Sequence, residues 1–276
     1  RLSGMDFEDI IGQHEMIERL RALADENRLP HAMMLCGPDG CGKMALAIAL
    51  AKYILNKGTY QVKGISHPDL HFTFPTIKLS KWNSEYKPIS DDFIEQWNEL
   101  LADGPYFSLA QWMEAMRAER QQAVITVGEA NELIKRLMIK SNQGGWKISI
   151  IWLPERMNIE CANKMLKLIE EPPTQTLFIL VCREPENLLE TIRSRVQRFD
   201  IKPIATDDIR QALIKQRGLE QEDAERVARL SNGNWLTALE ELNAGNENQM
   251  FFKSFVELMR LAYMKDVKIE DRKSGS

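Results

Sequence analysis

The chain has 276 residues, of which 44% are hydrophobic and 28% are charged, and its formal net charge is −4. These values are typical of a soluble globular protein with room for two domains. No stretch approaches the roughly 18 consecutive apolar residues of a membrane span, so no membrane association is expected. An acidic chain is not a generic nucleic-acid coat, and DNA contacts are expected to be local or shared with partners.

Strands and helices alternate along the first two-thirds of the chain. A helix is predicted for residues 7–30, because Ile17, Leu20 and Leu23 fall at helical spacing. Short apolar runs predict strands over 32–36, 67–74, 146–153 and 176–182, and helices are predicted over 44–55, 127–141 and 160–169. Strands separated by helices indicate an α/β fold with a parallel sheet, which we assign to residues 5–202.

A long stretch over residues 75–122 interrupts this alternation. It carries Trp82, Trp97, Tyr106 and Trp112, with helices predicted over 91–101 and 108–120. We interpret it as an insertion packed on the main domain. Large aromatic side chains are mostly buried, so core packing is favoured over a partner-binding role for Trp97 and Trp112.

The pattern becomes purely helical after residue 199. Helices are predicted over residues 206–218, 222–230 and 235–242, with a turn at 232–234 before the last of them. They define a small all-helical domain over residues 203–247. A further apolar helix is predicted over 251–264, within a terminal part that covers 248–276.

A glycine-rich turn follows the first predicted strand and opens the next predicted helix. Its spacing, Gly37-x-x-x-x-Gly42-Lys43, is that of a phosphate-binding P-loop. Gly37, Gly40 and Gly42 let backbone N–H groups turn toward phosphate oxygens, and Lys43 adds a positive charge. The loop is therefore expected to be able to hold ATP, ADP, phosphate or sulfate. The alternative is a glycine-rich turn with a solvent-exposed lysine.

Both elements that hold Mg²⁺ in a working P-loop protein are replaced. A serine or threonine is expected after Lys43, but this position holds Met44. The thioether of methionine is a poor ligand for a hard cation. The carboxylate expected at the end of a hydrophobic strand is replaced by Trp152 and Leu153, and Glu155 is out of register. Two losses at one metal site predict that hydrolysis has been abandoned and that no metal binds.

The four cysteines suggest a reducing environment. Cys36, Cys41, Cys161 and Cys182 form no CxxC pair, so the spacing supports neither a zinc site nor a disulfide framework. A cytoplasmic protein is therefore expected.

Several segments resemble bacterial clamp-loader subunits of the AAA+ class. The resemblance covers about residues 5–245 and is weakest across 76–122. It rests on FEDIIGQ at residues 7–13, HPD at 67–69, ANKMLKLIEEPP at 162–173 and TIRSRV at 191–196. The resemblance implies that residues 203–247 form a lid and that 248–276 begin a truncated helical collar or a tail. It also implies that Ile10 and Ile11 lie near the nucleotide base.

The same resemblance assigns Arg195 the role of an arginine finger, which reaches ATP bound by a neighbouring subunit. A guanidinium group is always charged and can bind phosphate oxygens in pairs. The alternative is that Arg195 is a surface arginine paired with an acid such as Glu186 or Glu190. The family's lid arginine is replaced by Leu236, and the four zinc-binding cysteines common in these subunits are absent from residues 56–66.

These features resemble the non-hydrolysing delta-prime branch more than the ATP-driven gamma/tau branch. The resemblance implies a subunit of the DNA polymerase III clamp loader that helps to load the sliding clamp during replication and requires no cofactor. Its implied partners are gamma/tau and delta subunits, the sliding clamp and, through the complex, primer-template DNA. The alternatives are an active gamma/tau-type ATPase and a P-loop scaffold protein.

Overall fold

A computed structural model describes residues 5–57, 67–139 and 145–273. Its centre is a five-stranded sheet in the order β2-β3-β4-β1-β5, and every neighbouring pair runs parallel. The predicted α/β fold with a parallel sheet is therefore confirmed. The strands are β1 (Ala32–Cys36), β2 (Leu70–Thr73), β3 (Lys147–Trp152), β4 (Thr176–Cys182) and β5 (Gln197–Asp200).

Burial explains which strands the sequence reveals. Strand β4 is buried at all seven positions and β3 at five of six, so both are continuous apolar runs. Strand β5 has no such signal, because only Phe199 of its four residues is buried, and the sequence does not predict it. The predicted strand over 67–74 is too long, since residues 67–70 form a turn closed by the Leu70 amide on the His67 carbonyl.

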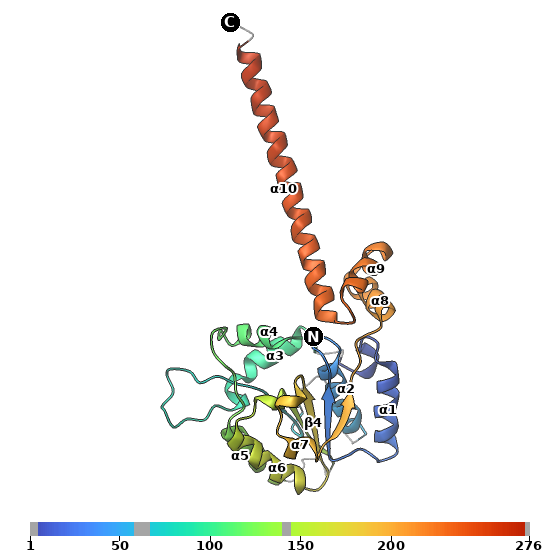
Figure 1. Ribbon diagram of the computed structural model, residues 1–276, viewed down its shortest axis with the longest axis vertical. Coiled ribbons are helices and arrows are strands. Elements are labelled where there is room, and N and C mark those ends of the chain that lie inside the picture. Colours follow the sequence, from blue (N-terminus) through green and yellow to red (C-terminus); the bar gives the residue numbers. More distant parts are fainter. Residues whose placement is uncertain (1–4, 58–66, 140–144, 274–276) are drawn as a thin grey trace.

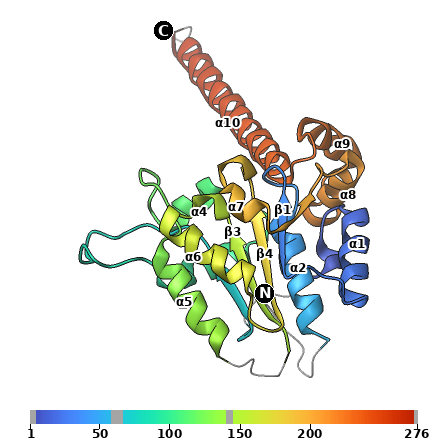
Figure 2. The ribbon, with the colours of Figure 1, turned by 60° about the horizontal axis from the view of Figure 1, so that its bottom comes forward.

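Helices cover both faces of the sheet (Figure 2). One face packs against α1 (His14–Asp25) and α2 (Lys43–Leu55), and the other against α5 (Val127–Met138), α6 (Ile159–Glu170) and α7 (Glu190–Arg193). The predicted helix over 7–30 is wrong at both ends. A short 3-10 helix, η1 (Phe7–Asp9), comes first, and Gly12 and Gln13 then have φ values of 64° and 59°. Left-handed residues cannot continue a right-handed helix, so α1 begins only at His14.

Residues 75–122 pack on the same sheet face as α2. They contain η2 (Ser90–Phe93), α3 (Ile94–Ala102) and α4 (Leu109–Ala115), so the predicted helix over 108–120 extends too far at its C-terminal end. Trp97 and Trp112 are fully buried, and both rings pack on Phe74, with centroids 4.2 and 5.0 Å away. Core packing of these two tryptophans is thus confirmed, and a partner cannot bind them without unfolding the segment.

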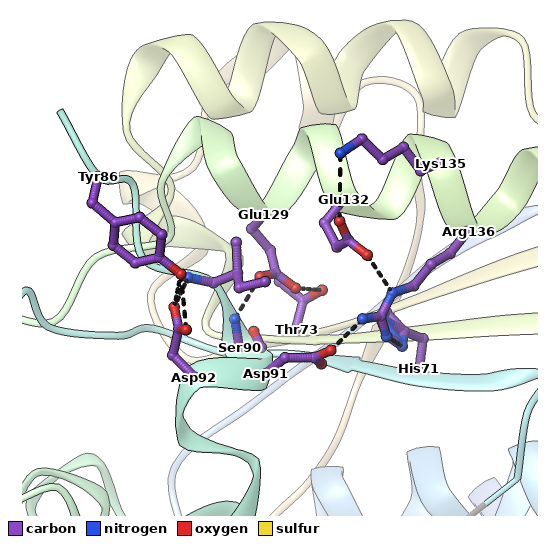
Figure 3. A network of polar contacts seen from close by, with 11 residues as sticks. His71, Thr73, Tyr86, Ser90, Asp91, Asp92, Glu129, Glu132, Lys135 and Arg136 are labelled. Carbon is purple, nitrogen blue, oxygen red and sulfur yellow. Dashed lines mark hydrogen bonds and ion pairs between the residues drawn. The ribbon is translucent and has the colours of Figure 1, made fainter.

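A polar network holds this segment to α5 and β2 (Figure 3). The Glu129 carboxylate accepts the Thr73 hydroxyl at 2.9 Å and the Ser90 amide at 2.6 Å. Burial raises the pKa of Glu129, against the opposing effect of these hydrogen bonds. Beside it, Arg136 donates to Asp91 and to Glu132, and one guanidinium nitrogen lies 2.9 Å from a ring nitrogen of His71. Ser90 and Asp91 are therefore fixed to α5 and, through Glu129, to β2.

The all-helical part comprises α8 (Thr206–Arg217), α9 (Gln221–Leu230) and α10 (Trp235–Lys273). Its own small core includes Ile209, Leu213, Val227 and Trp235. The separate helices predicted over 235–242 and 251–264 are wrong, since α10 is one helix of 39 residues. The single glycine between them costs only about 1 kcal/mol, and no proline interrupts the helix.

Helix α10 leaves the rest of the molecule as a long projection (Figure 1). It runs across residues 247 and 248, so the boundary predicted there is not marked by a break in the helix. The division of the chain into domains otherwise stays a prediction. No helix in the described ranges is both long and apolar enough to cross a membrane.

Candidate functional site

The glycine-rich turn connects β1 to α2 as predicted. Gly40 and Gly42 have φ values of 68° and 99°, which favour glycine. A Cβ atom at Gly40 would lie 1.9 Å from Asn234 Oδ1, so only glycine fits against this side chain. Gly40 is thus required by the close packing of Asn234 as well as by its φ value.

The segment before α10 is docked on this turn by the backbone as well. The Trp235 amide donates to the Gly40 carbonyl at 3.0 Å. Gln13 adds a second link, since its Nε2 donates to the carbonyls of Cys41 at 2.9 Å and Lys202 at 2.7 Å. The helical part, the N-terminal segment and the phosphate loop therefore form one connected unit.

Lys43 lies inside the loop and is buried. Its Nζ donates to the carbonyl of Gly37 and, at 2.8 Å, to that of Pro38. The solvent-exposed lysine of the alternative interpretation is therefore excluded. Next to it, Asp39 forms an ion pair with Arg183, with Nη1 and Oδ2 3.1 Å apart. An arriving phosphate would have to displace the carbonyl groups from Lys43 and meet the charge of Asp39.

The positions that would hold Mg²⁺ are apolar and filled. Met44, Trp152 and Leu153 are all buried. The Trp152 ring packs on the rings of Trp97 and Phe107, with centroids 5.4 and 5.1 Å away. The described ranges contain no group of three or more His, Cys, Asp or Glu side chains that could hold a metal ion. The chain therefore places a packed aromatic cluster where a metal-binding carboxylate was expected.

Glu155 has a different structural role. Its Oε1 accepts the amides of Arg183 and Glu184, each at 2.9 Å, and so caps the backbone just beyond β4. The acid nearest to the expected metal position is therefore used as a backbone acceptor.

Ile10 and Ile11 line a cavity of about 530 Å³ between the N-terminal segment, the start of α2, residues 103–106, α8 and α10. None of Gly37, Gly40, Gly42 and Lys43 lines it. Tyr106 stands at its wall and accepts a hydrogen bond from the Ile11 amide at 3.0 Å. Burial raises the pKa of Tyr106 from 10 to about 12.

Arg195 lies just after α7, on the side of the molecule that carries the end of α6. Its Nε is 2.6 Å from Glu170 Oε1, and its Nη1 donates to the Thr191 carbonyl at 2.8 Å. The side chain is 41% exposed. The alternative interpretation predicted that Arg195 is a surface residue paired with an acid such as Glu186 or Glu190. Arg195 is indeed paired at the surface, but its partner is Glu170 of the EEPP segment. The two segments that carry the family resemblance are thus joined by an ion pair.

Leu236, at the predicted position of the lid arginine, is buried in the first turn of α10. Its amide donates to Asn234 Oδ1 at 2.9 Å and so takes part in the N-terminal cap of α10. An apolar side chain therefore stands where the family has a positively charged arginine.

The sequence did not predict roles for Gln13, Tyr106, Glu170 or Asn234. An asparagine just before a helix is a recognisable capping signal, and Asn234 could have been identified in this way. Tyr106 and Ile11 are 95 positions apart, and no local pattern brings them together.

The fold is that of AAA+ P-loop proteins. A solved structure of a point mutant of Thermotoga maritima RuvB matches 91% of this chain and 68% of its own, with a TM-score of 0.54 at 16% identity. The T. maritima RuvB Holliday junction branch migration motor gives a TM-score of 0.52 over 87% of this chain and 63% of its own, also at 16% identity. At such low identity these neighbours establish the architecture alone.

The sequence defines the family within this class. The family profile described as "DNA polymerase III, delta subunit" matches residues 12–205. The chain belongs to this family, and relatives named DNA polymerase III subunit delta' are among the proteins that it resembles. The resemblance noted from the motifs is thereby confirmed.

Curated relatives include both branches. DNA polymerase III subunit delta' of Bacillus subtilis is 26% identical over 74% of this chain and 52% of its own length. The delta' subunit of Yersinia pestis is 42% identical over 28% of this chain and 23% of its own. Subunit tau of B. subtilis is 26% identical over 86% of this chain and 37% of its own. The chain thus spans about half or less of the length of these relatives.

Proposed function

We propose that the chain is a non-hydrolysing subunit of a DNA polymerase III clamp loader and supplies Arg195 to ATP held by a neighbouring subunit. The observation that carries this proposal is the packed cluster at the metal site. Trp152 lies against Trp97 and Phe107 where a carboxylate would hold Mg²⁺. Without the metal the charge that develops on a transferring phosphoryl group is not neutralised.

Arg195 is suited to act on a neighbouring subunit because its ion pair with Glu170 is weak. The Glu170 and Arg195 side chains are 39% and 41% exposed. An exposed ion pair of this kind contributes about 0–1 kcal/mol. A bound triphosphate carries more negative charge than one carboxylate, and a guanidinium group can contact two of its oxygens. Glu170 therefore positions Arg195 in the separate subunit and releases it on assembly.

The partners follow from this role. They are gamma/tau and delta subunits, the sliding clamp and primer-template DNA reached through the complex. The relatives named tau, gamma/tau and delta' support the assignment. No cofactor is required for it, because the nucleotide that reacts belongs to the neighbour.

The test is ATP hydrolysis by the chain alone and by a complex reconstituted with gamma/tau and delta subunits. The chain alone is expected to hydrolyse no ATP. In the complex, Arg195→Ala is expected to slow the one site that it faces by about 10³-fold and to leave assembly intact. Arg198→Ala is the matched control, because Arg198 is also exposed and paired, with Asp200 at 2.8 Å.

Two results would overturn the proposal. One is a complex with Arg195→Ala that assembles and hydrolyses ATP like the wild type. The other is Mg²⁺-dependent hydrolysis by the separate chain that Lys43→Ala abolishes, which would identify an active ATPase.

A further inference from the structure

The cavity of about 530 Å³ has the size of a small-molecule site and lies beside the phosphate loop. It is bordered by Ala45 in the first turn of α2 and by Ile11 of the N-terminal segment, with α8 and α10 across from them. A nucleotide whose phosphates lie at the start of α2 must place its sugar and base in a space next to that helix start. This cavity is therefore the base side of the cleft.

Tyr106 fills the passage between the cavity and the loop. Its hydroxyl accepts the Ile11 amide at 3.0 Å, which removes a backbone donor that a base or sugar would otherwise use. On the loop side, a Cβ atom placed on Gly42 would be 3.4 Å from the Tyr106 hydroxyl oxygen and 3.6 Å from ring atom Cε1. These are van der Waals distances, so the ring leaves no space for a ligand between Ile11 and Gly42.

The next residue closes the metal side of the same cleft. Phe107 is buried, and its ring meets that of Trp152 at an interplanar angle of 70°. Gly104, with a φ of 130°, permits the turn that brings both aromatic residues inward. Tyr106 and Phe107, which are consecutive in one short loop, thus cover the passage to the phosphate loop and the metal position.

We infer that residues 103–107 are an internal block in the nucleotide cleft, in which Tyr106 closes the passage between the base side and the phosphate loop and Phe107 covers the metal position. The inference rests on the proposed function in treating the cleft as a disused nucleotide site. It adds that the cleft, besides lacking metal ligands, is blocked by the chain itself between its base side and the phosphate loop. The loop also joins the N-terminal segment to α2, and so keeps the cleft in one closed arrangement without any ligand.

The first test is nucleotide binding by the full chain, followed with a fluorescent ADP analogue without Mg²⁺. Wild-type protein is expected to show no saturable binding. Tyr106→Ala opens the passage from the cavity to Gly42, and is expected to bind the analogue saturably, with an affinity at least about tenfold above the detection limit that bounds the wild type. Tyr53→Phe is the matched control, because the Tyr53 hydroxyl also makes a hydrogen bond, to Asp25 at 2.9 Å, outside the cleft.

The second test needs no nucleotide and covers the case in which Tyr106→Ala does not fold. Tyr106→Phe keeps the ring and removes only the hydroxyl acceptor. The Ile11 amide is expected to exchange its hydrogen slowly in the wild type and in Tyr53→Phe, and at least about tenfold faster in Tyr106→Phe, as local opening becomes easier.

Wild-type protein that binds the analogue as tightly as Tyr106→Ala would overturn the inference. Rapid exchange of the Ile11 amide in the wild type would overturn it as well. Neither result bears on the role of Arg195, because that role is tested by ATP hydrolysis at another subunit's site. Each proposal can therefore be contradicted without the other.

Discussion

The Nε atom of Arg195 lies 2.6 Å from Oε1 of Glu170, and so links the loop after α7 to the end of α6. Glu170 and Glu171 precede Pro172 and Pro173, which prevent α6 from continuing. The end of α6 thus sets the position of Arg195, which is proposed to contact ATP bound by a neighbouring subunit.

Removing the negative charge of this pair is expected to leave the fold almost unchanged. Glu170→Gln keeps the shape of the side chain, and an exposed pair contributes at most about 1 kcal/mol. The free energy of unfolding in urea should therefore shift by no more than this amount. In the complex, Arg195 is released more easily, and ATP hydrolysis should be equal to the wild-type rate or faster. Hydrolysis that falls as far as in Arg195→Ala would mean that the pair itself is needed in the assembled state.

Restoring a carboxylate at the metal position is expected to damage the fold. Trp152→Asp removes a ring that packs on Trp97 and Phe107 and buries a charge without a partner. The free energy of unfolding should fall by at least about 3 kcal/mol, whereas Trp152→Phe should cost less. Thermal unfolding measures both. A stable Trp152→Asp chain with Mg²⁺-dependent ATP hydrolysis would show that the metal site is latent and not filled.

Acid is expected to weaken the fold through His71. Burial and, secondarily, Arg136 lower the pKa of His71 from 6.5 to about 4, against the opposing charges of Asp91 and Glu132. Because the folded-state pKa is depressed, the unfolded chain takes up a proton first as the pH falls below 6.5. Stability is then lost between pH 6.5 and about pH 4, by roughly 2 kcal/mol on going from about pH 7 to about pH 5.

Urea unfolding at these two pH values tests this prediction. His71→Gln should abolish that part of the pH dependence, and His14→Gln, which alters an exposed histidine, should not. An equal pH dependence in the wild type and in His71→Gln would contradict it.

The sequence predicted the parts of the fold that carry local signals. The buried runs of β3 and β4 and the glycine spacing after β1 can be recognised without knowledge of the rest of the chain. It missed β5, whose exposed polar residues give no apolar pattern, and it divided α10 at a glycine that the helix tolerates.

The site was predicted less completely, because only some of its features carry a local sequence signal. The replacements at Met44, Trp152 and Leu153 are visible from motif positions alone. Their consequence, an aromatic cluster and a tyrosine within the cleft, depends on residues 103–107, which reach Ile11 and Trp152 only through tertiary structure.

The most direct test of the proposed function compares Lys43→Ala with Arg195→Ala in the reconstituted complex. In the proposed function, Arg195 of this chain acts on a neighbour's ATP, and the chain has no working nucleotide site of its own. ATP hydrolysis by the assembled complex should therefore be unchanged by Lys43→Ala, whereas Arg195→Ala should remove the share of hydrolysis that comes from the site that Arg195 faces. Loss of hydrolysis with Lys43→Ala, together with a wild-type rate for Arg195→Ala, would contradict it.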